Sequence, residues 1–208
     1  MGDWPFNSLE RGAYGAILAD PPWHFQTWGE GSKRNVTSKY STMQAADIAS
    51  LPVADLAAPD CVLFMWIVWP KLFEAVEVLG GWGFTYKTCA FAWLKGNASQ
   101  IDMFRDDMDP RMCMGFWTRA NSEVCLLATR GKPKRLSAGV RQGIIEPLRE
   151  HSRKPDCVHE RIEKLVPGPY LELFARASRP GWSSWGNEVG KFASINPPAE
   201  PKQVEFGL

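Results

Sequence analysis

Two consecutive prolines directly after a short apolar run are the feature that most constrains the fold. Residues 14–19 read YGAILA, and Asp20-Pro21-Pro22-Trp23 follows at once. An apolar run of this length, closed by turn residues, is typical of a buried strand. Because proline cannot continue a sheet ladder, the strand must end there. An acid, two prolines and an indole therefore lie just past the carboxyl end of a strand, where open α/β sheets bind their ligands.

The chemistry of this tetrapeptide suits a planar ring that carries an exocyclic amine. The prolines fix φ and remove two backbone donors, which stiffens the loop and leaves its carbonyls free to accept hydrogen bonds. Asp20 adds a carboxylate acceptor, and Trp23 adds a flat apolar face. Adenine and cytosine are rings of this kind. An ordinary turn at the end of a strand is the alternative interpretation.

The rest of the chain alternates between segments typical of strands and of helices. We expect strands over residues 14–19, 61–68, 84–93, 122–129 and 170–174, and helices over residues 43–50, 70–79 and 156–166. Such alternation predicts an α/β fold with a mostly parallel sheet and helices on both faces. The 208 residues fit one domain. We expect that domain over residues 1–192 and a flexible, proline-rich tail over residues 193–208.

Three long stretches fit neither pattern, namely residues 26–38, 96–120 and 131–153. We expect each of them to lead away from a strand end that shares an edge with Asp20. Between residues 130 and 154, eight Lys and Arg face two Glu, a local excess of +6 in a chain of net charge +1. This excess favours a phosphate-binding surface that includes Lys132, Lys134 and Arg135. A solvated loop is the alternative.

Cysteine and histidine usage favours a reducing compartment and no metal. The five cysteines are an odd number without a CxxC pair, which is typical of buried free thiols. The three histidines do not fall at ligand spacing with them, so no metal site is expected. The sequence shows neither a signal peptide nor a long apolar span, so we expect a cytoplasmic protein without a membrane partner.

Beyond the DPPW segment, further motifs follow in a specific order. They are KYSTM (39–43), VLFMW (62–66), FAWLK (91–95), SRKPD (152–156), LELFAR (171–176) and GNE (186–188). In this order, the chain from Tyr14 to Lys191 resembles the MT-A70 family of S-adenosylmethionine-dependent adenine-N6 methyltransferases. The resemblance implies a Rossmann-like methyltransferase fold with a permuted motif order. It also implies a catalytic segment made of Asp20, Pro21, Pro22 and Trp23.

The resemblance assigns a cofactor site to the later motifs. It implies that S-adenosylmethionine is bound by Asp20, Lys154, Phe174, Arg176, Asn187 and Glu188. Lys154 and Arg176 would face the methionine carboxylate or nearby polar groups, because guanidinium and ammonium groups suit carboxylates. Asn187 and Glu188 would hold the ribose hydroxyls. The chain departs from the family at Ser178-Arg179, where His-Asn is frequent.

On the substrate side, Trp23 would stack on a base that has left its helix. Tyr40 is either a second stacking aromatic or a core residue, and Trp66 either lines the pocket or packs. The polar residues that align with the family's pocket and loops are Lys95, Arg119 and Glu123. Asp20 and the Pro21 carbonyl would each accept one N–H bond from the adenine amine and so direct its lone pair at the methyl group.

We expect DNA as the substrate, because the chain is compact and shows no zinc finger or other appended RNA-binding module. An RNA adenine-N6 methyltransferase is the first alternative. A non-catalytic MT-A70-like scaffold subunit is the second, and the intact DPPW segment argues against it. The resemblance allows a homodimer or a heterodimer with another MT-A70-like subunit.

Overall fold

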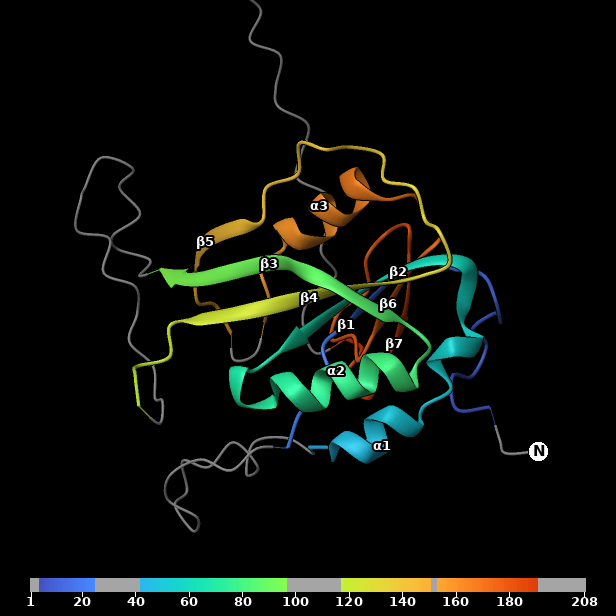
Figure 1. The fold of residues 1–208 in the computed structure, drawn as a ribbon, viewed down its shortest axis with the longest axis horizontal. Helices are drawn as coiled ribbons and strands as arrows, with labels where there is room; N and C mark the ends of the chain where they lie inside the picture. The colour runs from blue at the N-terminus through green and yellow to red at the C-terminus, as the bar shows by residue number, and fades with distance from the viewer. Residues whose placement is uncertain (1–3, 25–41, 97–116, 151–152, 191–208) are drawn as a thin grey trace, which may run out of the picture.

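A computed structural model of the chain describes residues 4–24, 42–96, 117–150 and 153–190 (Figure 1). Three earlier expectations lie outside these residues: the role of Tyr40, most of the stretches 26–38 and 96–120, and the tail over residues 193–208. None of the helices in the described ranges has the length and apolar character needed to cross a membrane.

The described strands form one seven-stranded sheet with the order β5-β3-β4-β2-β1-β6-β7. The strands are β1 (Tyr14–Ala19), β2 (Ala57–Ile67), β3 (Thr85–Gly96), β4 (Ser122–Arg130), β5 (Gly143–Pro147), β6 (Tyr170–Leu173) and β7 (Trp182–Trp185). Four of the neighbouring pairs are parallel, and both pairs that include β4 are antiparallel. Strand β4 therefore runs against the other six.

Helices cover both faces of the sheet (Figure 1). The first face carries α1 (Ala45–Ser50) and α2 (Leu72–Gly81), with the short 3-10 turns η2 (Val53–Asp55) and η3 (Trp69–Lys71) beside them. The other face carries α3 (Cys157–Leu165). These observations confirm the expected α/β class, with a mostly parallel sheet between two helical layers.

Strand β1 shows why a continuous apolar run belongs at the centre of such a sheet. Ile17 and Ala19 belong to the hydrophobic cluster on the α1 and α2 side, whereas Ala16 and Leu18 belong to the cluster on the α3 side. All four are at most 3% exposed. Successive side chains of a strand point to opposite faces, so a strand with helices on both faces must be apolar throughout.

The structure corrects the expected elements at three places. Strand β2 begins at Ala57, four residues earlier than expected, and strands β5 and β7 were not expected at all. Both missed strands are short, and they are the two outermost strands of the sheet. Strand β5 lies inside the basic stretch that we expected to be a loop.

The glycine of the GNE segment is required by a close backbone approach. A Cβ atom at Gly186 would lie 2.7 Å from the backbone nitrogen and oxygen of Ala175. Ala175 lies just after β6 and donates its N–H to the Trp185 carbonyl at 2.9 Å. The end of β7 is therefore held against the turn that follows β6, and only glycine leaves room for it.

This packing predicts that Gly186→Ala destabilises the fold, because the added methyl group must push two backbone segments apart. We expect a loss of about 1–3 kcal/mol in the free energy of unfolding, measured by urea denaturation. Gly80→Ala is the matched control, since a Cβ atom there has no neighbour within 4 Å. That control should leave stability unchanged or raise it, because alanine favours a helix more than glycine does. Equal effects of the two substitutions would contradict the close approach.

Candidate active site

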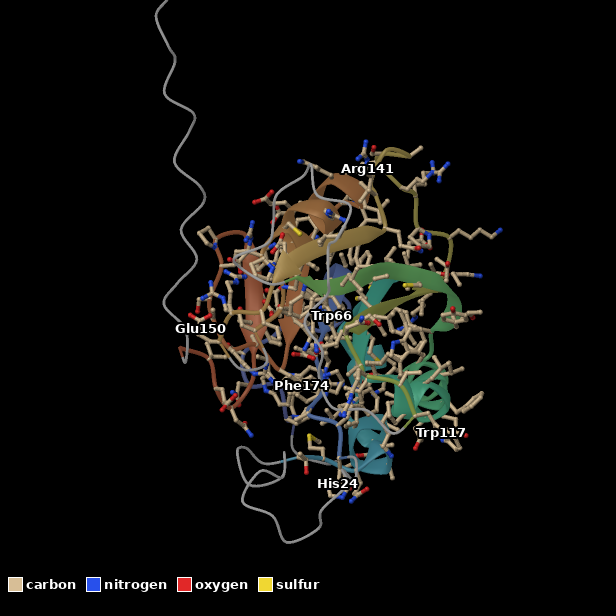
Figure 2. All side chains as sticks on the ribbon, turned by 90° about the vertical axis from the view of Figure 1, so that its left-hand side faces the viewer. His24, Trp66, Trp117, Arg141, Glu150 and Phe174 are labelled. Carbon is tan, nitrogen blue, oxygen red and sulfur yellow. The ribbon has the colours of Figure 1, made fainter. Side chains whose placement is uncertain are left out.

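Residues from five strands meet at one edge of the sheet. This edge is the one at which the parallel strands end, and it runs across the strands. Asp20 follows β1, Trp66 lies near the end of β2, and Phe174 follows β6 (Figure 2 labels Trp66 and Phe174). Strand pairing aligns Ala19 with Met65 on one side and with Leu173 on the other, so these three strands end together. Because β4 runs the other way, its first residues, not its last, lie at this edge. Glu123 of β4 therefore pairs in register with Trp93 near the end of β3.

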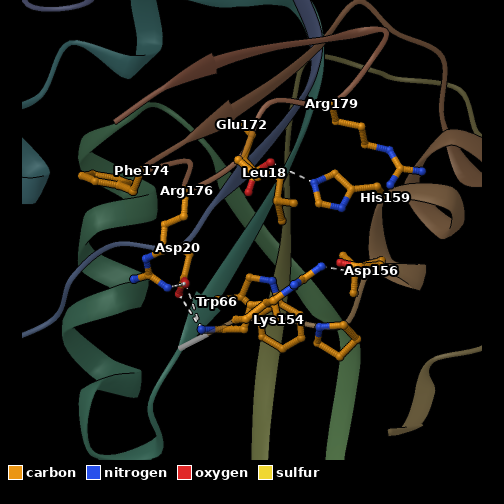
Figure 3. A pocket seen from close by; sticks show the side chains of 14 residues that line it. Leu18, Asp20, Trp66, Lys154, Asp156, His159, Glu172, Phe174, Arg176 and Arg179 are labelled. Atoms are coloured by element: carbon orange, nitrogen blue, oxygen red, sulfur yellow. Dashed lines mark hydrogen bonds and ion pairs between the residues drawn. The ribbon is translucent and has the colours of Figure 1, made fainter. Parts of the chain in front are cut away.

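Charged side chains of alternating sign form a continuous chain of ion pairs along this edge. Its members, in spatial order, are Lys95, Glu123, Lys154, Asp20, Arg176 and Glu188. The closest N···O distances between successive members are 2.7, 3.3, 2.9, 3.3 and 3.2 Å. All six residues were predicted from the sequence as site residues, and the structure brings them together (Figure 3 shows Asp20, Lys154 and Arg176).

Asp20 is the central acceptor of this chain. Its Oδ1 and Oδ2 each lie 2.9 Å from Lys154 Nζ, and its Oδ2 also accepts from Arg176 Nη1 at 3.3 Å. A carboxylate offers about four acceptor positions. These contacts fix the orientation of Asp20 and leave room for about one further donor.

The pKa values of Glu123 and Lys154 reflect the same arrangement. Burial alone would raise the pKa of Glu123, but Lys154 and Lys95 outweigh this and lower it to about 2. Burial alone would lower the pKa of Lys154, but Asp20 and Glu123 outweigh it and raise that pKa above its ordinary value. Both groups therefore remain charged in a largely buried position, as paired buried charges require.

A pocket opens beside Asp20 on the α3 side of the sheet (Figure 3). Five predicted site residues line it: Asp20, Trp66, Lys154, Phe174 and Arg176. Phe174 has a left-handed backbone with φ of 61°, which turns the chain sharply after β6. This turn sends the Arg176 side chain back toward Asp20.

The far wall of the pocket consists of residues that were not predicted as site residues. They are Arg153, Asp156, His159, Glu172 and Arg179, together with apolar neighbours. His159 of α3 and Glu172 of β6 form a pair at 2.9 Å. Glu172 is a charged residue inside the apolar part of LELFAR, and that signal could have identified it. Across the described ranges, no three His, Cys, Asp or Glu side chains are grouped to hold a metal ion.

The structure corrects the expected role of Trp23. Its side chain is 5% exposed, belongs to the core on the α1 and α2 side, and donates its indole N–H to the Trp66 carbonyl at 3.0 Å. A ring in this position has no open face for a base. Here Trp23 anchors the proline loop to β2 instead.

The sequence predicted that the carbonyls of the two prolines are free to accept. In the structure, each of them already accepts one hydrogen bond. The Pro21 carbonyl accepts from Trp23 N, and the Pro22 carbonyl accepts from Met43 N, each at 2.8 Å. A carbonyl oxygen has a second lone pair. Pro21 can therefore accept one more donor, and its loop is fixed by these bonds.

Two further predicted site residues, Asn187 and Arg119, lie outside the pocket. Asn187 is exposed in the turn after β7 and does not line the pocket. Arg119 is exposed just before β4, on the same edge as Asp20. Neither position tests the predicted contact.

The expected position of the basic loop is wrong. Lys132, Lys134 and Arg135 follow the end of β4, and Arg130 at that end pairs with Cys61 in the first half of β2. The Lys132 N–H donates to the Asp60 carboxylate at 2.7 Å. This segment lies at the edge opposite to Asp20, because β4 is antiparallel to its neighbours. Only the later part of the basic stretch, with Arg153 and Lys154, returns to the pocket.

The lowered pKa of Glu123 predicts a specific dependence of stability on pH. Ionised Glu123 stabilises the fold above its ordinary pKa of 4.5, and this contribution is lost as the pH falls toward 2. Glu123→Gln should therefore be less stable than wild type at pH 7, by up to about 3 kcal/mol. The difference should shrink between pH 4.5 and 2. Glu77→Gln, at an exposed position of α2, should follow wild type at every pH. A difference between Glu123→Gln and wild type that does not change with pH would contradict the ion-pair chain.

Comparison with known proteins agrees with this geometry. The profile of the MT-A70 family matches residues 14–188. The type II methyltransferase M.MunI of Mycoplasma sp is 32% identical over 206 residues, which cover 90% of this chain and 82% of M.MunI. The human N(6)-adenine-specific methyltransferase METTL4 is 29% identical, over 89% of this chain and 39% of the human protein. The N(6)-adenosine-methyltransferase MT-A70-like protein of Arabidopsis thaliana is also 29% identical, over 89% of this chain and 25% of the plant protein. This chain thus spans well under half of the last two relatives, and by its sequence and fold it belongs to the MT-A70 family.

Proposed function

We propose that this protein transfers a methyl group from S-adenosylmethionine to the N6 amine of adenine in DNA. The observation that carries the proposal is the Asp20 carboxylate, which is held by Lys154 and Arg176 at the mouth of a pocket. We further propose that residues 1–192 form the methyltransferase domain and that the protein acts in the cytoplasm.

The residues of the pocket fit S-adenosylmethionine, which supplies an electrophilic methyl group when bound. The molecule carries both charges of an amino acid, and the pocket offers cations and anions in nearly equal number. Glu188, held at 3.2 Å by Arg176, and Asn187 beside it would accept the ribose hydroxyls. Phe174 offers an apolar surface between the two ends.

Asp20 and Pro21 would bind and orient the adenine amine. The lone pair of this nitrogen is delocalised into the ring, so the nitrogen is a poor nucleophile until it becomes pyramidal. One N–H would donate to the remaining position on Asp20, and the other to the second lone pair of the Pro21 carbonyl. Both bonds strengthen as the nitrogen becomes positively charged, which favours the transition state over the ground state.

The ion pairs define how Asp20 acts. Lys154 and Arg176 hold its carboxylate in one orientation, so it needs little reorganisation when charge develops on the amine. No proton has to leave before the transfer. The methylated nitrogen is strongly acidic afterwards and gives its proton to a carboxylate or to water.

DNA is proposed as the substrate because of the pattern among the relatives. The relative that this chain spans most fully of the three, at 82%, is named a type II methyltransferase. The relative named an adenosine methyltransferase is spanned to only 25%. We therefore infer that this chain acts on DNA, with the target adenine turned out of its stack.

The substrate can be identified directly with labelled S-adenosylmethionine and matched DNA and RNA oligonucleotides. Digestion to nucleosides should show label in N6-methyldeoxyadenosine from the DNA. Label only in the RNA would leave the chemistry intact and reverse the proposed substrate. Label in neither, with the cofactor bound, would favour the non-catalytic scaffold.

Asp20→Ala should reduce methyl transfer by a factor of about 100 or more, because an acceptor that acts in the transition state is lost. The readout is kcat/KM, with circular dichroism to verify the fold. Asp55→Ala is the control, since Asp55 forms an exposed pair with Arg11 near the beginning of β1, whereas Asp20 follows its end. A variant that keeps a tenth of wild-type turnover would remove Asp20 from catalysis.

The two edges of the sheet predict different salt dependences of DNA binding. Arg119→Ala should reduce the slope of log affinity against log salt by about one unit, because Arg119 lies on the edge of Asp20. The triple alanine variant of Lys132, Lys134 and Arg135 should leave that slope unchanged, because these residues lie at the other edge. A slope reduced by the triple variant alone would show that DNA reaches the far edge.

A further inference from the structure

Two buried ring nitrogens at the pocket have no hydrogen-bond partner. They are Trp66 Nε1 and His159 Nδ1, and only Ser184 Oγ shares this property among the described side chains. Trp66 is 1% exposed and His159 is 8% exposed. Both residues line the pocket beside Asp20, whereas Ser184 does not (Figure 3). Buried polar atoms are nearly always bonded, so two of them at one pocket indicate a ligand.

Other buried tryptophans of the protein follow the usual rule. Trp23 donates its indole N–H to the Trp66 carbonyl at 3.0 Å. Trp82 donates to the Ile48 carbonyl, and Trp93 donates to the Glu146 carbonyl, each at 2.9 Å. Trp66 is the exception, and it differs from these three in facing the pocket.

The two atoms have opposite hydrogen-bonding character. An indole N–H can only donate. The other nitrogen of His159, Nε2, lies 2.9 Å from Glu172 Oε2, and a carboxylate only accepts, so Nε2 carries the proton. In the neutral ring Nδ1 is then an acceptor. The ring is further fixed by an edge contact with Trp182 at 4.8 Å. With a neutral His159 ring, the pocket wall therefore presents one donor and one acceptor.

We propose that Trp66 Nε1 and His159 Nδ1 bind the α-amino-acid end of the methyl donor, an inference that rests on the proposed function. The carboxylate of that end accepts the hydrogen bond from Trp66, and its ammonium group donates one to His159. Trp66 and His159 are positioning residues for the donor.

The surrounding charges fit this orientation. Lys154 Nζ lies 5.6 Å from the centre of the Trp66 ring, which places a cation beside the proposed carboxylate. Glu172 lies directly behind His159, which places an anion behind the proposed ammonium. Lys154 and Glu172 thus have the signs that the two charged ends of a zwitterion require.

Calorimetry with two ligands tests the inference without any turnover. S-adenosylhomocysteine retains the amino-acid end, and 5′-methylthioadenosine lacks it. Trp66→Phe and His159→Phe should each bind S-adenosylhomocysteine about tenfold or more weakly. Both variants should bind 5′-methylthioadenosine within about twofold of wild type, because that ligand cannot use the lost contacts.

Trp82→Phe is the matched control. It removes an indole N–H that is bonded to Ile48 in the core on the other side of the sheet. In the absence of ligand, both substitutions leave a cavity in the core, but only the control also breaks an indole hydrogen bond, so it should lower the urea midpoint more than Trp66→Phe does. The control should leave both ligand affinities unchanged.

The possible results separate this inference from the proposed function. If wild type does not bind S-adenosylhomocysteine, both are overturned. If wild type binds it and the two variants bind it equally well, only the inference is overturned, and the two nitrogens serve ordered water. A similar loss for both ligands would also overturn it, because that result indicates a general distortion of the pocket. A loss specific to S-adenosylhomocysteine supports it.

Discussion

The ion pair between Asp20 and Lys154 is the interaction on which the site depends. The two residues are 134 positions apart, and their charged atoms lie 2.9 Å apart with side chains that are 18% and 17% exposed. A charge this buried is stable only with a partner, and removal of either one leaves the other uncompensated. The pair can form only if the end of β1 and the segment before α3 meet at one edge. The pair therefore couples the sheet topology to the site.

The chain of ion pairs along this edge has a net charge of zero and holds its charged side chains in fixed positions. Three cations alternate with three anions from Lys95 to Glu188, so the set is neutral as a whole. It links the residues proposed to face adenine with those proposed to face the methyl donor. A site whose dipoles are already fixed by such pairs does not have to reorganise as charge develops on the reacting nitrogen. Neutrality also means that attraction of nucleic acid must come from neighbouring basic groups.

The sequence predicts the centre of the fold better than its margins. Strand β1 has the expected limits because a run of six apolar residues allows no other burial. Strand β5 was missed because only one of its five side chains is buried, and β7 because it is four residues long with two serines. Edge strands have little apolar signal, and their pairing is set by the rest of the sheet.

The candidate site was likewise predicted only in part from the sequence. The residues of the ion-pair chain were predicted from the resemblance to the family, whereas their mutual contacts came only with the three-dimensional arrangement. The basic loop was misplaced because periodicity does not reveal strand direction, and one antiparallel strand moved Lys132 to the far edge. Trp23 was misjudged because a sequence does not show which face of a ring is buried. His159 lies in no motif, so its place in the site is recognised only from its contact with Glu172 in the structure.

A crystal structure with a bisubstrate analogue, in which the N6 atom of adenosine is joined to an S-adenosyl amino acid, tests the account most directly. The account predicts that the N6 atom lies within about 3.2 Å of the Asp20 carboxylate and of the Pro21 carbonyl. It also predicts that the amino-acid end occupies the pocket between Trp66 and His159. An adenine bound away from Asp20, with the Asp20–Lys154 pair untouched, would contradict it.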